Sequence, residues 1–231
     1  MPVLRVEGLL YRRAGDAGGF ALAVDTLQLD RSEVLAITGP SGCGKSTLLD
    51  VLALLRPPSV ARHFELMGED VLALWRERDV DRCTALRAQH VGVVLQTGGL
   101  LPSLPLLENV RLGQDLLGWR DDELIDRLLQ RLELQGLERR LPAQLSIGQR
   151  QRVAIARALA HKPALVLADE PTASLGADHA GPALDLLLAL AREDGAAVVI
   201  VTHDVALLAS RRVPMRRLAA GAQGVMVLEP A

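Results

Sequence analysis

Aromatic side chains are scarce in this sequence of 231 residues, because Phe, Trp and Tyr together make up 2% of it. Proteins that bind single-stranded nucleic acid use aromatic rings as stacking platforms for bases, so this scarcity disfavours such a role. The charge points the same way: 26 basic and 28 acidic residues leave a formal net charge of −2, with no basic excess to meet a phosphate backbone. We therefore expect no nucleic-acid partner.

Cysteine is also scarce, and long apolar runs are missing. Two cysteines, Cys43 and Cys83, cannot make a disulfide framework and fit a reducing compartment. No stretch approaches the roughly 20 apolar residues of a membrane-spanning helix, and the N-terminus, MPVLRVEG, has no signal-peptide layout. We expect a soluble protein that reaches a membrane only through a partner. Its 49% hydrophobic content supports a sizeable core.

Residues 39–47, GPSGCGKST, carry the most specific motif. A glycine is followed by four residues and then by Gly44-Lys45-Ser46, which is the pattern of a phosphate-binding loop. Apolar residues flank it on both sides, so we expect a buried strand before the loop and a helix after it. The motif requires these surroundings, and the alternative is a glycine-rich turn that fits by chance.

The composition of this loop suits a nucleotide. Glycines let the backbone curl round a β-phosphate with several N–H groups pointing inward, and the next helix adds the partial positive charge of its N-terminus. Lys45 would bridge the β- and γ-phosphates, and the Ser46 hydroxyl would be a ligand of Mg²⁺. The predicted nucleotide-binding residues of the loop are Gly39, Pro40, Ser41, Gly42, Cys43, Gly44, Lys45, Ser46 and Thr47.

Apolar runs and helical periodicities alternate along the chain. Strands are expected at 3–11, 20–29, 34–38, 91–95, 164–168 and 196–201, with a glycine-rich turn at 15–19. Helices are expected at about 45–56, 71–78, 83–88, 121–134 and 182–192. The alternation predicts an α/β fold of the P-loop NTPase type, with a mostly parallel sheet and an N-terminal antiparallel β subdomain. The helix-rich block at about 106–160 is expected to be an inserted helical subdomain of a single domain, residues 1–231.

An acidic pair follows the strand at 164–168. Asp169 is expected at the carboxyl edge of the sheet, where ligands bind in open α/β folds, and it can hold Mg²⁺ directly or through water. Glu170 points in a different direction and can polarise an attacking water molecule. The alternative is an acidic strand end of the kind common in α/β proteins.

Residues 145–149, LSIGQ, precede another helix. Ser146 is a plausible N-cap, so the chain has a second helix N-terminus ready for phosphate. One chain that binds one nucleotide has no use for two such sites. The simplest explanation is a dimer in which Ser146, Gly148 and Gln149 of one copy close on the γ-phosphate held by the other. The alternative is an ordinary capped helix.

Together these motifs resemble the nucleotide-binding subunit of ATP-binding cassette (ABC) transporters over almost the whole chain. The phosphate loop matches Walker A, LVLADE at 165–170 matches Walker B, and LSIGQ matches the signature motif. The resemblance implies that Gln96 is the Q-loop glutamine, which senses Mg²⁺ and nucleotide, and that His203 contacts the γ-phosphate. It also places Tyr11 on the adenine ring. Taken alone, these three residues would be a polar strand cap, a strand-end histidine and a core or surface tyrosine.

The resemblance further implies an ATPase that uses ATP and Mg²⁺. Glu170, His203 and Gln96 would be catalytic, and Ser46, Gln96 and Asp169 would hold the metal. It implies an ATP-sandwich homodimer attached to integral membrane permease-type subunits on separate chains. The protein would then be cytoplasmic, at the inner face of the inner membrane.

Two departures from the family pattern leave other functions open. Ile147 replaces the first glycine of the signature, and Gly176 stands where the family usually has an aspartate that communicates across the dimer. A nucleotide-gated switch with weak hydrolysis is therefore an alternative. A DNA-repair or translation relative is disfavoured, because no coiled-coil insertion or second cassette is present. The segment 100–110 and the short C-terminus resemble the lipoprotein-release and macrolide-export branch, in which dimerisation is thought to transmit force to periplasmic domains.

Overall fold

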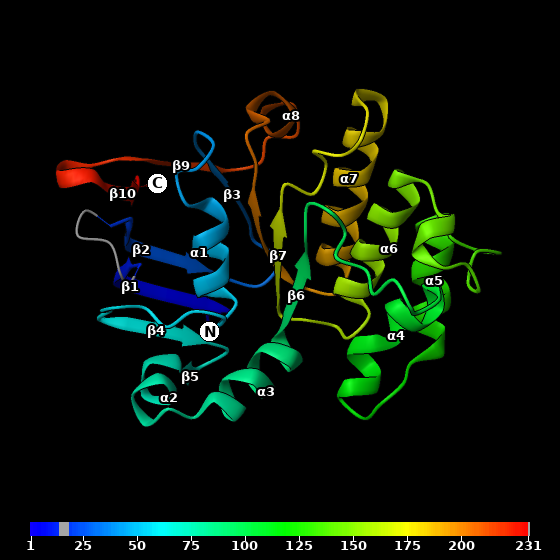
Figure 1. Cartoon of the computed structure of the whole chain (residues 1–231), viewed down its shortest axis with the longest axis horizontal. Helices are drawn as coiled ribbons and strands as arrows, with labels where there is room; N and C mark the ends of the chain where they lie inside the picture. Colours follow the sequence, from blue (N-terminus) through cyan, green and yellow to red (C-terminus); the bar gives the residue numbers. More distant parts are fainter. Residues whose placement is uncertain (14–18, 231) are drawn as a thin grey trace.

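The computed structural model of the chain describes residues 1–13 and 19–230 (Figure 1). In chain order its elements are β1 (Leu4–Arg12), β2 (Ala21–Leu29), β3 (Val34–Thr38), α1 (Lys45–Leu52), β4 (His63–Leu66), β5 (Glu69–Asp70), α2 (Val71–Glu77), α3 (Val80–His90), β6 (Val91–Val94), α4 (Leu106–Leu116), α5 (Asp122–Arg131), η1 (Pro142–Gln144), α6 (Ile147–Leu159), β7 (Leu165–Asp169), α7 (Ala177–Glu193), β8 (Ala197–Val201), α8 (Val205–Ser210), β9 (Met215–Ala220), η2 (Ala222–Gly224) and β10 (Val225–Leu228). The turn expected at 15–19 lies outside these residues, apart from Gly19.

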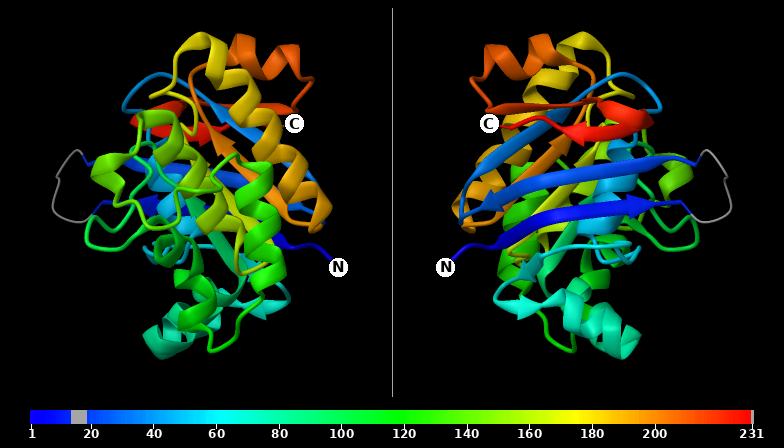
Figure 2. Two further views of the ribbon diagram at one scale, coloured as in Figure 1. Left: turned by 90° about the vertical axis from the view of Figure 1, so that its right-hand side faces the viewer. Right: turned by 90° about the vertical axis from the view of Figure 1, so that its left-hand side faces the viewer.

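A ten-stranded sheet in the order β5-β4-β1-β2-β10-β9-β3-β8-β7-β6 runs through the described part of the chain. The strands from β9 to β6 pair in parallel, whereas β1, β2, β4 and β5 pair antiparallel. β10 joins the two halves, since it pairs parallel with β2 and antiparallel with β9. The long β1 and β2 cross one side of the molecule (Figure 2). The expected P-loop α/β architecture, with an antiparallel N-terminal part, is confirmed.

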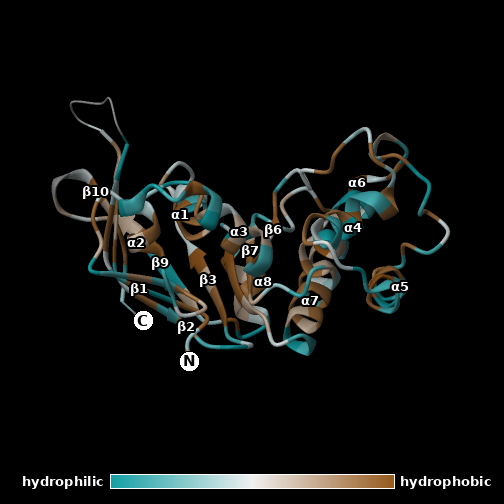
Figure 3. Ribbon diagram, turned by 90° about the horizontal axis from the view of Figure 1, so that it is seen from below, coloured by the Kyte–Doolittle hydropathy of each residue, from teal (hydrophilic) through white to brown (hydrophobic). Residues whose placement is uncertain are grey.

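Two apolar cores lie on opposite faces of the parallel strands. In β7, Leu165 and Leu167 belong to the core that also contains β1, β2 and α1, whereas Val166 and Ala168 belong to the core beneath α4–α7. A strand covered on both faces reads as an unbroken apolar run, which explains why the sequence LVLA lacks alternation. Figure 3 shows these apolar strands inside, between layers of helices. Asp169 is the last residue of β7 and is only half-buried, whereas the four residues before it are buried.

The helices α4, α5 and α6 lie together beside α7, away from the antiparallel strands (Figure 1). Gly92 of β6 brings α6 against the sheet: a Cβ atom there would lie 2.2 Å from the carbonyl oxygen of Ala158. That approach is possible only for glycine, and it anchors the C-terminal half of α6 to the parallel strands. The division of the chain into one domain with a helical part at 106–160 stays a prediction.

Some element boundaries differ from those expected. α1 ends at Leu52 rather than near residue 56, because Leu54 takes a left-handed conformation with φ 57° and stops the helix. α7 begins at Ala177, five residues before the expected start, and carries Pro182 inside it. The expected strands are found within one residue at each end. β9 and β10 were not expected.

Candidate functional site

The phosphate loop connects β3 to α1 and is shaped by glycine. Gly42 and Gly44 have φ values of 77° and 99°, a region that other residues rarely adopt. Gly44 is the N-cap of α1 and makes no side-chain cap, so the first N–H groups of the helix point into the loop. A Cβ atom on Gly44 would lie 2.2 Å from Cζ of Phe20, so the ring of Phe20 lies directly against the loop.

Lys45 lies inside this loop with 8% of its surface exposed. Its Nζ donates to the carbonyl oxygens of Gly39 and Pro40, at 2.9 and 3.0 Å. The ammonium group is therefore held among backbone atoms of its own loop and lines the pocket beside it. A cation in this position is ready to meet an anionic ligand.

Asp169 faces the start of α1 from the end of β7. Burial raises the pKa of its carboxyl, and the neighbouring Glu170 raises it further, while a hydrogen bond from the Ser46 hydroxyl and the charge of Lys45 lower it. A partly buried carboxylate beside a hydroxyl group at a pocket wall is a suitable pair of oxygen ligands for a hard cation.

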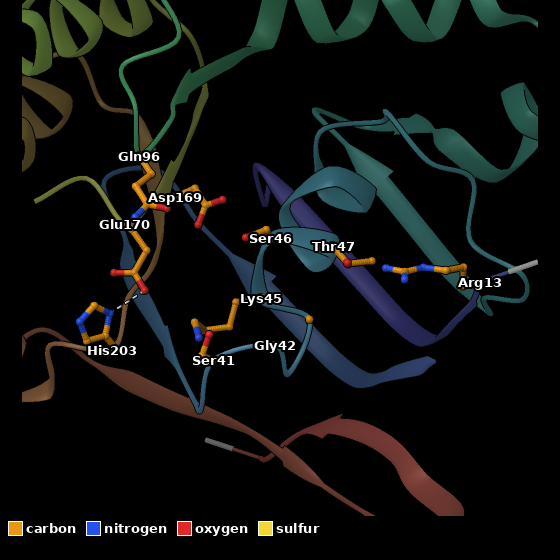
Figure 4. Close-up of a pocket in the computed structure, with 11 residues that line it drawn as sticks. Arg13, Ser41, Gly42, Lys45, Ser46, Thr47, Gln96, Asp169, Glu170 and His203 are labelled. Carbon is orange, nitrogen blue, oxygen red and sulfur yellow. Dashed lines mark hydrogen bonds and ion pairs between the residues drawn. The ribbon is translucent and has the colours of Figure 1, made fainter. Parts of the chain in front are cut away.

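Glu170 follows with an unusual backbone, since its φ is 46°. Its N–H donates to the carbonyl of Val201 at 2.9 Å, which ties it to the end of β8. Its Oε2 accepts from the hydroxyl of Thr202, and its Oε1 lies 2.9 Å from Nδ1 of His203. The carboxylate is 14% exposed and the imidazole 70% exposed, so the pair stands at the pocket rim with the histidine outermost (Figure 4).

These residues share one pocket of about 530 Å³, lined by Arg13, Ser41, Gly42, Gly44, Lys45, Ser46, Thr47, Gln96, Asp169, Glu170 and His203. Figure 4 shows how these residues are arranged from one end of the pocket to the other. Gln96, Asp169, Glu170 and His203 gather at one end, the phosphate loop lies in the middle, and Arg13 lies beyond Thr47 at the other end. Motifs that are far apart in the sequence therefore meet at one place.

Several predicted residues lie elsewhere. Gly39, Pro40 and Cys43 belong to the loop but do not line the pocket, and Cys43 is buried. Tyr11 is placed differently from the expectation: it is 7% exposed, packs in the core that contains α1, and its hydroxyl accepts from Nη1 of Arg56 at 3.4 Å. Its ring therefore does not reach the pocket in this structure.

Arg13 is the pocket residue that sequence reasoning missed. It follows the end of β1, two positions after Tyr11, and it lines the pocket, whereas Tyr11 is buried. An arginine after a strand end belongs to no motif.

The signature segment lies outside the pocket. Ser146 caps α6 by accepting from the N–H of Gln149 at 3.2 Å, and Oε1 of Gln149 accepts from the N–H of Ser146 at 2.9 Å. This reciprocal capping box fixes the helix start. Ser146, Gly148 and Gln149 do not line the pocket of their own chain, and Ile147 is 52% exposed.

The described residues include no cluster of three or more His, Cys, Asp or Glu side chains that could hold a metal ion. Asp169 and Ser46 would need other oxygen atoms, such as those of a phosphate, to complete the coordination of Mg²⁺. Among the same residues, no helix is long and apolar enough to cross a membrane.

Comparison with known proteins gives consistent results. The profile of the family described as "ABC transporter" matches residues 22–173. The lipoprotein-releasing system ATP-binding protein LolD of Idiomarina loihiensis is 41% identical over 200 residues, 85% of each chain. The macrolide export ATP-binding/permease protein MacB of Bradyrhizobium diazoefficiens is 44% identical over 207 residues. Those residues are 87% of this chain, but the chain spans only 31% of that relative.

Solved structures agree with these matches. One is described as the dimeric post-hydrolysis state of an ATP-binding cassette bound to ADP and phosphate. It superposes with a TM-score of 0.77 at 30% identity and covers 98% of this chain and 97% of that one. A second dimeric cassette, from a bacterial ABC transporter, gives a TM-score of 0.76 at the same identity.

Proposed function

This chain belongs to the ABC transporter family, and from that premise we propose that two copies of it close on two ATP molecules and so drive a membrane partner. As a member of the family, it is an ATP-binding and ATP-hydrolysing subunit. The observation that carries the residue roles is the single pocket in which Lys45, Ser46, Asp169, Glu170 and His203 meet.

The phosphate loop holds the triphosphate. Lys45 exchanges the carbonyl oxygens of Gly39 and Pro40 for the β- and γ-phosphates, and the loop N–H groups with the start of α1 bind the β-phosphate. Thr47 lines the same wall and lies on the path toward the nucleoside.

The donor set fits Mg²⁺. Burial raises the pKa of Asp169, so a cation at this place would stabilise its charged form, and the Ser46 hydroxyl donates a hydrogen bond to it. Ser46, Asp169 and the amide of Gln96 would hold the ion together with phosphate oxygens, and the ion would neutralise charge on the transferred phosphoryl group.

Glu170 orients and activates the attacking water, and His203 contacts the γ-phosphate. The Thr202 hydroxyl donates to the Glu170 carboxylate, and the carbonyl of Val201 accepts from the Glu170 N–H. These bonds keep Glu170 at the pocket rim, on the side of Asp169 that faces His203. Because His203 is the more exposed of the two, it can leave Glu170 for a phosphate oxygen and free one carboxylate oxygen for water.

The second copy supplies Ser146, Gly148 and Gln149. Within its own protomer Gly148 has no packing reason to be glycine: the nearest described atom to an added Cβ is Cδ2 of Leu175, at 3.8 Å. The space is open on the side where a partner's phosphate would approach the N-terminus of α6. This supports the ATP-sandwich homodimer, with both signature segments facing the nucleotide of the other copy.

The membrane partners are permease-type subunits on separate chains, so the protein works at the cytoplasmic face of the membrane. Similarity to LolD and MacB supports a system of the lipoprotein-release or macrolide-export kind, in which ATP-driven closure does mechanical work. Gly176 favours one alternative, a nucleotide-gated switch with weak hydrolysis. It caps α7 without any side-chain bond where the family usually has an aspartate, and phosphate release at background level with the membrane partner present would support that alternative.

Replacing Glu170 with Gln tests the proposal. The variant should bind ATP as the parent does, lose about 100-fold or more in phosphate release, and run as a dimer with ATP and Mg²⁺ in size-exclusion chromatography with light scattering. Glu123→Gln, an exposed change of the same kind on α5, is the matched control and should behave as the parent. Phosphate release at the parental rate in the Glu170 variant would overturn the catalytic assignment.

A further inference from the structure

The pocket has a phosphate end and an opposite end with a different composition. Lys45, Ser46 and Asp169 lie toward one side, and Arg13 lies past Thr47 on the other (Figure 4). If the γ-phosphate lies near Glu170 and His203, the chain of phosphates runs along α1 toward Thr47. The sugar and base then leave the loop at Arg13.

Arg13 and Phe20 form a paired structure at this end. The N–H of Arg13 donates to the carbonyl of Phe20 at 3.0 Å, and its guanidinium carbon lies 5.6 Å from the centroid of the Phe20 ring. That distance is within the range of a cation–π contact. The ring in turn lies against Gly44, where a Cβ atom would be 2.2 Å away. The guanidinium is therefore backed by a ring that is itself set against the phosphate loop.

Aromatic residues are otherwise missing from the pocket. Tyr11 is in the core, and no described pocket residue carries an aromatic ring other than the imidazole of His203 at the far end. Residues 14–18 contain no aromatic side chain in the sequence. A nucleotide base that extends beyond the phosphate loop at this end would lie next to the planar guanidinium of Arg13.

We propose that the Arg13 guanidinium, backed by the Phe20 ring, is the surface on which the nucleotide base stacks. The inference rests on the proposed ATP site and adds the group that binds the base. A guanidinium stacks on any base through its π-face and offers donors but no acceptor, so it does not read the 6-amino group of adenine. The chain then binds ATP and GTP with similar affinity.

The experiment measures affinity of the full chain for ATP, GTP and inorganic tripolyphosphate, each with Mg²⁺, by calorimetry. Replacing Arg13 with Ala should weaken ATP and GTP binding alike, by about 5- to 150-fold, which is the range for loss of one base stack. Tripolyphosphate has no base, so its affinity should stay within twofold of the parent. Arg13→Lys keeps the charge but not the plane and should resemble Arg13→Ala. Arg12→Ala, an exposed arginine one position earlier on β1, is the matched control.

Three results would overturn the proposal. They are unchanged ATP affinity in Arg13→Ala, an equal loss for tripolyphosphate, which would make Arg13 a phosphate counterion, or a parental preference of more than tenfold for one purine. Failure of the ATP site itself is detected separately. Lys45→Ala should abolish binding of all three ligands, and unchanged binding in that variant would reject the proposed function whatever Arg13 does.

Discussion

Asn109 fastens the loop that follows Gln96, and its removal should have a measurable cost. The side chain is fully buried in α4. Its Oδ1 accepts from the N–H of Leu101 at 2.8 Å, and its Nδ2 donates to the carbonyls of Leu101, Leu104 and Pro105 at 3.1, 2.8 and 3.3 Å. The other end of the loop is held by Arg157 of α6, which donates to the carbonyls of Gly99 and Gly98 at 2.8 and 2.9 Å. One amide therefore organises residues 101–105.

The effect of Asn109→Ala follows from the groups that it leaves without partners. The carbonyl of Leu101 still accepts from Leu104, and that of Pro105 still accepts from the N–H at position 109. The N–H of Leu101 and the carbonyl of Leu104 lose their partners, at about 1–3 kcal/mol each. Leu101 is 41% exposed, so water reaches this loop and the lower values apply. We expect a loss of about 2–3 kcal/mol in the free energy of unfolding, or about 5–10 °C in Tm.

Denaturant unfolding followed by circular dichroism measures this loss. Asn109→Asp should lose at least as much, because it keeps the acceptor for Leu101 but directs a carboxylate at the carbonyl oxygens of Leu101, Leu104 and Pro105. Gln130→Ala removes an exposed amide from α5 and serves as the control, with a change within about 0.5 kcal/mol. An Asn109→Ala protein that unfolds at the parental midpoint would refute the reasoning.

Two further predictions concern the signature helix and the dependence of stability on pH. Gly148→Ala should raise the free energy of unfolding by about 0.5 kcal/mol, because its own chain leaves room for the methyl group, yet lower phosphate release by crowding the partner's nucleotide. Earlier thermal unfolding of this variant would contradict the idea. Burial lowers the pKa of His161 and of His90, so the folded protein favours neutral rings. Their contribution to stability is therefore complete above the unfolded pKa of about 6.5 and is lost as pH falls toward the lower folded pKa. His161→Gln should make the loss of stability between pH 7 and 5 shallower in urea titrations, with the remaining slope due partly to His90, and an unchanged slope would contradict this.

The motifs predicted the phosphate end of the site because each one specifies its own local structure. Lys45, Asp169, Glu170, Gln96 and His203 all line one pocket, since strand–loop–helix units in a parallel sheet end at the same edge. The base end could not be predicted in this way. Tyr11 lies in β1, where it is buried in the core and accepts a hydrogen bond from Arg56, whereas Arg13 follows the strand and lines the pocket, and no sequence motif distinguishes the two.

The C-terminal strands were missed for another reason. β9 reads MRRLAA, and its Arg216 looks like a solvent-facing residue. In the fold Arg216 is 8% exposed and donates to the carbonyls of Thr26 and Glu229, both at 2.6 Å. The pairing of β10 with β2 joins residues about 200 positions apart, so no local sequence pattern predicts it.

The hydrogen bonds from Lys45 to the carbonyls of Gly39 and Pro40 have a consequence for repeated turnover. The two loop carbonyls accept N–H donors of Lys45 that phosphate oxygens would otherwise take, so binding of a phosphate exchanges one set of hydrogen bonds for another. When a nucleotide leaves, Nζ of Lys45 can return to these two carbonyl oxygens, so the buried ammonium group is not left without hydrogen-bond partners. The affinity of Lys45 for a phosphate is therefore the difference between two sets of hydrogen bonds, and it is smaller than the strength of either set alone.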